Sequence, residues 1–235
     1  MELNYQFMLH TLGLLLQGVP VTLSLTAVAL VAATPFAFFM ALARLHNTPY
    51  VQGPIKLYIS LMRGVPVVIQ ILLIYSLLPS VLNVIFKELG IQYNIFDLNT
   101  IWYAYIIFTI STIAVLSEVF RSALASVSAG QLEAGWAMGM STFHTYVRII
   151  IPQALTVALP SLCNVTVSLL KNTSLAFMMA VKDVTAVGKI AASYGYNYVE
   201  AYIDVFVAYI ILCSLTQALF RLAENRCGRY RRRTV

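Results

Sequence analysis

A short polar run interrupts one of the most apolar stretches of the sequence. Lys171, Asn172, Thr173 and Ser174 follow one largely apolar run and precede another. A cation and three hydrogen-bonding side chains in such surroundings could contact the carboxylate or polar side chain of a small substrate, and ionisable residues inside a membrane are functional candidates by default. The alternative is that these side chains pair between helices and brace the fold. We favour the interpretation that they line a substrate pathway.

No group of residues in the sequence indicates catalysis. His10, His46 and His144 are scattered, and no nucleophile stands near a base in a recognisable pattern. The sequence has no G-x-x-x-x-G-K-[ST] motif, the loop that cradles ATP phosphates. The three cysteines match neither a disulfide framework nor a metal signature. We therefore expect a protein that is not an enzyme and that binds no cofactor or metal itself.

Composition places the polar run in a membrane protein. Of 235 residues, 60% are hydrophobic and 10% are charged, whereas soluble domains have about 25% charged residues. Mean hydropathy is +0.82. A spanning helix needs ~20 mainly apolar residues, and five segments meet this requirement: about Leu12 to Leu42, Leu57 to Leu78, Thr100 to Val119, Ile149 to Met179, and Ala201 to Leu222. We expect an all-α membrane protein with five transmembrane helices in a single domain, residues 1–235.

The distribution of Lys and Arg predicts which loops face the cytoplasm. Basic residues gather after the first and third spans and in the tail, and the positive-inside rule puts such loops in the cytoplasm. They are Arg44, Lys56, Arg121, Arg148 and the six arginines from Arg221 onward. The other loops carry more acids and clusters of aromatic rings, which favour the headgroup level. We expect the N-terminus outside and the C-terminus in the cytoplasm. The basic tail is interpreted as facing anionic lipid, not nucleic acid.

The predicted cytoplasmic loop 122–150 contains a helix signal. Ser128 followed by Gln131 has the spacing of a capping box, which predicts that a helix begins there. Glu133 then lies in the first turn, where the helix dipole favours a carboxylate.

An apolar stripe runs along this loop. Its residues recur at the spacing of one helix face, or of two short helices joined near Ser141. They are Leu132, Trp136, Met140, Phe143 and Val147. The stripe is too short to span a membrane, so it lies on lipid, folds under the membrane domain or docks into another protein. Gly135 and Gly139 are one turn apart on a separate face and predict a close approach to the backbone.

These residues resemble the permease subunits of bacterial ABC importers, closest to those for polar amino acids. That family's loop pattern is E-A-A, three residues, G, nine residues, I, x, L-P, and this chain matches it at Glu133-Ala134, Gly139, Ile149 and Pro152. Further blocks match in order over about Gly18 to Glu224. They are Arg63-Gly64-Val65-Pro66 with R-G-T-P, Ser117-Glu118-Val119-Phe120-Arg121 with A-E-I-x-R, the block 148–154 with R-I-I-L-P-Q-A, and the block 170–175 with L-K-N-T-S-L.

The chain departs from the family pattern at a few positions. Gly135 replaces the second alanine of the loop motif, Ile151 its leucine, and Val65 the threonine of R-G-T-P. Ser122 and Ala123 stand where a Gly-Gly pair often follows the arginine. All of these replacements are small or apolar, so they bear on fine specificity and not on membership.

The resemblance implies the fold and the partners. The fold is that of a type I ABC importer permease with a core of about residues 18–224, whose 122–150 loop sits as a coupling helix in a cleft of the ATPase. The implied coupling residues are Glu133, Ala134, Gly135, Trp136, Gly139 and Met140. The implied partners are two ABC ATPase subunits that use ATP and Mg, and a second permease subunit in a homodimer or close heterodimer. An extracytoplasmic amino-acid-binding protein and the lipid of a bacterial cytoplasmic membrane complete the set.

The resemblance also implies inward transport of a polar amino acid by alternating access. Cystine, glutamine, arginine and histidine all fit the block pattern. The candidate pathway residues are Arg63, Glu118, Lys171, Asn172, Thr173 and Ser174. Two alternatives stay open: Glu118 and Arg121 could form only an interfacial ion pair, and the break at Pro66 could be a simple kink. Two other functions also stay open, an autonomous secondary transporter or channel and a membrane-anchored scaffold.

Overall fold

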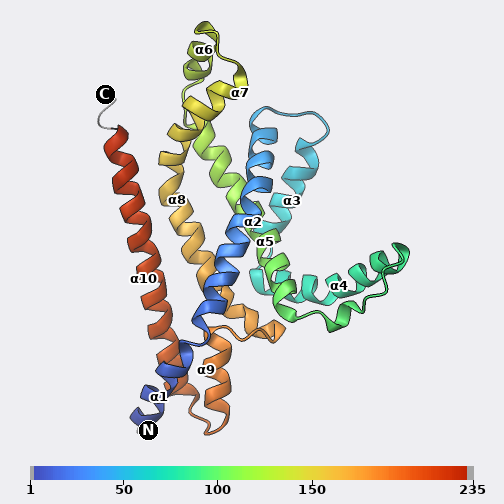
Figure 1. The fold of residues 1–235 in the computed structure, drawn as a ribbon, viewed down its shortest axis with the longest axis vertical. Coiled ribbons are helices and arrows are strands. Elements are labelled where there is room, and N and C mark those ends of the chain that lie inside the picture. The colour runs from blue at the N-terminus through green and yellow to red at the C-terminus, as the bar shows by residue number, and fades with distance from the viewer. Residues whose placement is uncertain (1–2, 232–235) are drawn as a thin grey trace. The chain divides into compact units, whose positions relative to one another are not determined.

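All regular secondary structure in the part that the structure describes is helical. The computed structural model describes residues 3–231, with side chains to residue 227, and no strand occurs within those limits. The helices are α1 (Tyr5–Leu15), α2 (Val19–Leu45), α3 (Gln52–Gly64), α4 (Val67–Glu88), η1 (Ile95–Asp97), α5 (Thr100–Ala125), α6 (Ala129–Ala137), α7 (Thr142–Thr145), η2 (Tyr146–Ile150), α8 (Ile151–Asn172), η3 (Thr173–Met179), α9 (Val184–Ser193) and α10 (Tyr198–Arg231) (Figure 1). The all-α prediction is confirmed. Of the predicted basic tail, Arg232 and Arg233 lie outside the described residues, as do the side chains of Arg229 and Arg231.

Five helical segments are long and apolar enough to cross a membrane, which confirms the predicted number. They are Val19–Leu45, Val67–Glu88, Thr100–Ala125, Thr142–Met179 and Tyr198–Cys227. The fourth is one continuous run through α7, η2, α8 and η3. The prolines inside α2, α4 and α8 do not end these helices, because neighbouring groups in a membrane protein can satisfy the freed carbonyls.

The prediction for the start of the first span is wrong. Its first residues belong to α1, which ends before α2 begins and packs against α9. Gly18 stands at this break because a Cβ there would lie 2.6 Å from the backbone nitrogen of Val184. The Val184 N–H in turn donates to Thr22 Oγ1 at 3.3 Å. The chain therefore turns at a close backbone contact that no local pattern indicates.

The predicted bounds of the second span are also wrong, because they begin within α3 and end before α4 does. Val65 and Pro66 separate α3 from α4, and the spanning helix is α4. Pro66 has no N–H to donate and disfavours a helical residue before it. The carbonyl of Val65 is satisfied by the buried side chain of Gln70, whose Nε2 donates at 2.7 Å, while Ser111 Oγ donates to Gln70 Oε1 at 2.9 Å. Arg63-Gly64-Val65-Pro66 thus contains a helix break, and the side chain of Gln70 satisfies the carbonyl that the break leaves free.

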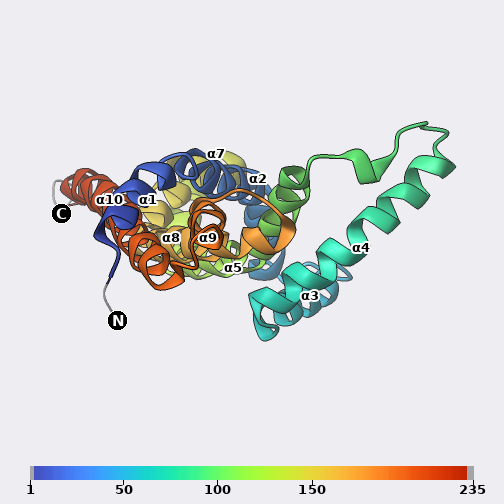
Figure 2. The same cartoon turned by 90° about the horizontal axis from the view of Figure 1, so that it is seen from below.

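The chain divides into two compact units, each described by itself. The first contains residues up to 32, 64–112 and 168–214. Its main core is formed by α2, α4, α5 and the α8–η3 segment, around Leu25, Ile71 and Phe108. A smaller core joins the end of α1 to α9 and α10 through Leu15 and Val205. Figure 2 shows α4 leading to the extended segment and η1 that return the chain to α5.

The second unit contains residues 33–63, 113–167 and 215 onward. Its larger core joins α2, α5, η2 and α8 around Ala41, Leu124 and Ile150. A second core packs α3 on α2 and α5 through Ile59 and Ala114. Small residues at these contacts allow close helix approach, as is usual where lipid gives no hydrophobic drive between helices. The prediction of a single domain stays a prediction.

Candidate functional site: the elbow and the polar residues of the spans

The segment 129–150, here called the elbow, consists of α6, α7 and η2. Figure 1 shows α6 and α7 folded back on each other between α5 and α8. α6 begins after Ser128, as predicted, with Ser128 Oγ accepting from the Gly130 N–H at 3.3 Å. The reciprocal half of the predicted capping box is not formed, because Gln131 Oε1 instead accepts from Gln153 Nε2 at 3.5 Å. The predicted alternative of two short helices is correct, since Ser141 caps α7.

Gly139 makes the turn between the two helices. Its φ is +77°, in the left-handed region that favours glycine. The Met140 N–H donates to the carbonyl of Gly135 at 3.0 Å, and the Gly139 N–H donates to that of Trp136 at 2.9 Å. This is the hydrogen-bond pattern of a Schellman motif, in which glycine ends the helix and satisfies its last carbonyls. The backbone conformation therefore accounts for Gly139 without any partner.

Gly135 faces α7 of the same chain. A Cβ added there would lie 2.5 Å from both Oγ1 and Cγ2 of Thr145, and both residues are buried. Thr145 is held in place because its Oγ1 donates to the Ser141 carbonyl at 3.0 Å. The predicted close approach occurs at Gly135, where the approaching group belongs to this chain, but not at Gly139, where an added Cβ would meet no atom within 4 Å. Gly135, which stands where the family has alanine, thus leaves room for the side chain of Thr145.

A second side-chain contact closes the elbow. Trp136 Nε1 donates to Thr142 Oγ1 at 3.1 Å, which ties α6 to the first residue of α7. Buried or half-buried Trp N–H groups need such a partner. Trp136 nevertheless stays 51% exposed. Two contacts therefore hold α6 against α7 and leave an aromatic residue on the outer surface.

The outer surface of the elbow is apolar with one acid. Trp136, Met138, Phe143 and Val147 are exposed at 51%, 82%, 72% and 45%. Glu133 and Ala134 are exposed beside them, and Glu133 forms no salt bridge with any side chain that the structure describes. Two members of the predicted stripe are placed differently: Leu132 packs into the core of the second unit and Met140 is half-buried. Sequence spacing missed Met138, because it lies off the helical stripe at the turn.

The polar run across the end of α8 and the start of η3 is split between exposed and buried side chains. Lys171 is exposed, and Asn172 and Ser174 are half-buried. Thr173 is fully buried, and its Oγ1 donates to the Leu170 carbonyl at 2.7 Å. The helix changes here from α8 to the 3₁₀ segment η3. The change of helix type lies within the polar run itself, a feature often found at functional or strained positions.

Glu118 stands between two arginines. Its carboxylate lies 2.6 Å from Arg44 Nη1 at the end of α2 and 2.5 Å from Arg121 Nη2, one turn further along α5. These side chains are between 15% and 33% exposed. The ion pair between Glu118 and Arg121, which was one of the alternatives from the sequence, thus forms, and Arg44 of α2 joins it. Arg63, in contrast, is exposed in the last turn of α3.

The buried acid Asp183 caps α9. This helix lies between the predicted fourth and fifth spans, where a loop was expected from the sequence. Asp183 accepts from the N–H groups of Thr185 and Ala186 at 3.0 and 2.9 Å and from the Tyr209 hydroxyl at 3.1 Å. Burial raises the pKa of this carboxyl, against the lowering effect of these hydrogen bonds. An Asp at the N-cap before an apolar run was the available signal.

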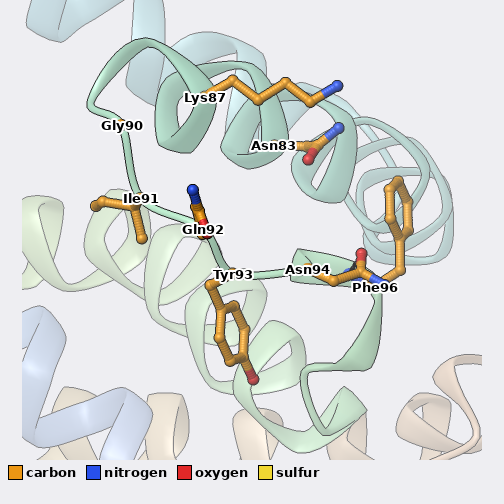
Figure 3. A pocket seen from close by; sticks show the side chains of 8 residues that line it. All are labelled: Asn83, Lys87, Gly90, Ile91, Gln92, Tyr93, Asn94 and Phe96. Atoms are coloured by element: carbon orange, nitrogen blue, oxygen red, sulfur yellow. Dashed lines mark hydrogen bonds between the residues drawn. The ribbon is translucent and has the colours of Figure 1, made fainter.

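One cavity of about 650 Å³ lies at the end of α4 (Figure 3). Amide, ammonium and aromatic side chains line it: Asn83, Lys87, Gly90, Ile91, Gln92, Tyr93, Asn94 and Phe96. They come from α4, from the loop that follows it and, in the case of Phe96, from η1. Sequence reasoning did not single out this cavity.

Five helical segments able to cross a membrane, an elbow with an exposed apolar surface and an ion-paired helix end define a helical membrane protein. The family described as "Binding-protein-dependent transport system inner membrane component" matches residues 33–229, and the chain belongs to this family.

Named relatives narrow the class to amino-acid ABC permeases. The chain is 37% identical to the "Probable amino-acid permease protein YxeN" of Bacillus subtilis, covering 95% of this chain and 97% of the relative. It is 32% identical to the "L-cystine transport system permease protein TcyL" of the same organism, covering 92% and 88%. Among solved structures, "Crystal structure of an amino acid ABC transporter with histidines" superposes with a TM-score of 0.76 at 28% identity, covering 96% of this chain and all of that one. The family and fold expected from the sequence blocks are confirmed.

Proposed function

We propose that this chain is the permease subunit of an ATP-driven importer that moves a polar amino acid into the cytoplasm by alternating access. The observation that carries the proposal is the elbow, a preorganised two-helix body whose outer surface is apolar around one unpaired acid. Family membership gives the class of transport system. The names of the relatives support an amino acid as substrate, and one of them names cystine.

The proposed orientation has the elbow in the cytoplasm of a bacterium and the N-terminus outside. Basic residues gather at the elbow end of the spans, with Arg44 and Arg121 beside Glu118 and with Arg148 in η2. The positive-inside rule assigns that end to the cytoplasm. The tyrosines of the 194–198 loop then lie outside, where an amino-acid-binding protein would deliver substrate; Tyr194 and Tyr196 are 87% and 85% exposed.

The elbow is proposed to dock into a cleft of a separate ATPase subunit. Trp136, Met138 and Phe143 provide large apolar contact area, and aromatic and Met side chains are enriched at such interfaces. Glu133 beside them would meet a basic residue of the ATPase. Gly135 and Gly139 act inside the elbow, by allowing the close packing of Thr145 and the turn to α7. Two ATPase subunits and a second permease subunit complete the proposed assembly, in which ATP and Mg are bound by the ATPase.

The substrate pathway is proposed to pass Lys171 and Asn172. An exposed ammonium within a spanning segment is costly in lipid, so it is expected to face water or another protein. Lys171 would attract the carboxylate of an amino acid, and Asn172 and Ser174 would offer hydrogen bonds. Arg63 is exposed as well, whereas Glu118 is already paired with two arginines and Thr173 is buried.

The test is uptake by proteoliposomes that contain the chain with its ATPase, partner permease and binding protein. We expect uptake of an amino acid that requires ATP, with L-cystine and L-histidine as first probes. Glu133→Lys should lower uptake and substrate-stimulated ATP hydrolysis together by about tenfold or more, because a like charge at a docked interface costs several kcal/mol. The matched control is Glu88→Lys, the same charge reversal at an exposed acid at the end of α4.

Two outcomes would contradict the proposal. Uptake by the chain alone, driven by an ion gradient, would identify an autonomous transporter. Undiminished uptake by assembled Glu133→Lys would remove the coupling role from the elbow.

A further inference from the structure

A hydrogen bond joins the elbow to the end of α2. The Tyr146 hydroxyl and His46 Nε2 lie 2.8 Å apart, and the two rings meet edge to face with centroids at 5.8 Å. Tyr146 is the first residue of η2, and His46 is 100 residues earlier in the chain. No family motif described above includes either residue.

Hydrogen bonds fix the backbone around His46. His46 is the last residue before a left-handed turn at Asn47, whose φ is +50°. The Thr48 N–H donates to the Ala43 carbonyl at 3.0 Å, and the Asn47 N–H donates to that of Arg44 at 3.4 Å. This Schellman pattern fixes the end of α2, and Gln52 Nε2 adds a bond to Asn47 Oδ1 at 2.8 Å. A hydrogen bond between positions already ordered costs little further entropy.

Within the elbow, α6 and α7 connect to α8 through a turn that is not α-helical. Residues 146–150 form a π-helical turn, η2, in which the backbone bonds span five residues. Such wide turns are rare and occur often at functional positions. Along the backbone, a movement of α6 and α7 reaches α8 only through η2. A side-chain contact made at Tyr146, where the turn begins, passes the movement on without crossing η2.

The end of α2 is also bound to α5. Two residues before His46, Arg44 reaches Glu118, and Phe38 stacks edge to face on Phe120 at 6.1 Å. Two contacts therefore connect the elbow to α5 by way of α2: that of Tyr146 with His46 and that of Arg44 with Glu118. All four residues belong to the second unit.

We propose that His46 and Tyr146 are positioning residues that pass movement of the elbow to the end of α2, and through Arg44 and Glu118 to α5. This inference rests on the proposed function, since the movement is the one that a docked ATPase would impose. Apolar packing of Leu42 and Leu45 holds the same helices together but is non-directional. The hydrogen bond fixes the orientation of the elbow on α2.

The experiment measures amino acid taken up per ATP hydrolysed, in proteoliposomes that contain the complete assembly, with L-cystine and L-histidine as probes. The variants are Tyr146→Phe, His46→Phe and the double variant, which keep the rings and remove the bond. His46→Gln retains a side-chain amide near the position of Nε2. The matched control is Tyr50→Phe, which removes the hydroxyl of a 97% exposed tyrosine in the same α2–α3 loop.

We expect each Phe variant to lower the uptake per ATP by about two- to tenfold, the factor that corresponds to the loss of one net hydrogen bond. The double variant should be no worse than either single variant, because all three lack the same bond. His46→Gln and Tyr50→Phe should stay near the wild-type ratio. A merely structural role would reduce the amount of assembled complex and leave the ratio per complex unchanged.

An unchanged ratio in the single variants would overturn the inference, whether or not the amount of complex falls. So would losses that multiply in the double variant. The proposed function fails separately, if the wild-type assembly shows no ATP-dependent uptake.

Discussion

Replacing Gly135 by alanine tests the packing inside the elbow. Alanine would gain about 1 kcal/mol of helix propensity in α6. Its Cβ would lie 2.5 Å from Oγ1 and Cγ2 and 3.1 Å from Cβ of Thr145. Overpacking of a buried contact costs about 1–3 kcal/mol. Thr145 is β-branched and held by its bond to the Ser141 carbonyl, so it cannot rotate away without a further loss. We therefore expect a net destabilisation of the elbow near the upper end, about 2 kcal/mol.

The second substitution in this test relieves the contact. Thr145→Ala removes the two atoms nearest to the new Cβ and also removes one hydrogen bond, which costs about 1 kcal/mol by itself. In the double variant Gly135→Ala/Thr145→Ala, a tight Cβ contact remains but the clash is gone. The double variant should therefore be more stable than the sum of the two single effects indicates, with an interaction energy of about 1–3 kcal/mol.

Amide hydrogen exchange of residues 129–145, read by mass spectrometry in nanodiscs, measures the local free energy of opening. Gly135→Ala should raise exchange there by about an order of magnitude or more while α4 and α9 stay unchanged. The matched control is Gly130→Ala, at a position in the same helix whose added Cβ would meet only Ser128 Oγ, at 3.5 Å. Unchanged protection in Gly135→Ala, or no recovery in the double variant, would refute the packing argument.

Two further substitutions test the charged residues of the spans. Glu118→Gln should destabilise the second unit by up to about 3 kcal/mol, because Arg44 and Arg121 lose their shared counter-charge while partly buried. Thermal unfolding in detergent measures this, and an unfolding midpoint equal to that of the wild type would show that the ion pairs are only a surface feature. Lys171→Met should lower uptake by about tenfold or more with little change in thermal stability, whereas Lys171→Arg should keep part of the uptake. Lys182→Met, at an exposed loop lysine, is the control, and full uptake in Lys171→Met would place the pathway elsewhere.

The number of spanning helices could be predicted from the sequence because their cause is local. Lipid requires about 20 apolar residues per span and satisfies no backbone polar group, so hydropathy alone reports them. The beginning of α6 at Ser128 and the joint at Ser141 were likewise local, since a hydroxyl that caps a helix acts within three residues. The family could be predicted because its motifs, such as the block from Glu133 to Pro152, are read directly from the sequence.

The break between α1 and α2 and the direction of side chains were decided only by tertiary structure. The chain turns at Gly18 because Val184, far along the sequence, occupies the space of a Cβ. Gly135 packs against Thr145 of the same chain, while Met138, off the apolar stripe, becomes the most exposed apolar residue of the elbow. The Tyr146–His46 bond joins residues 100 apart. Sequence by itself determined which long segments are helical and apolar, because those properties depend on neighbours in the chain. Contacts between segments distant in sequence required the fold, because one sequence contains no record of which residues share a space.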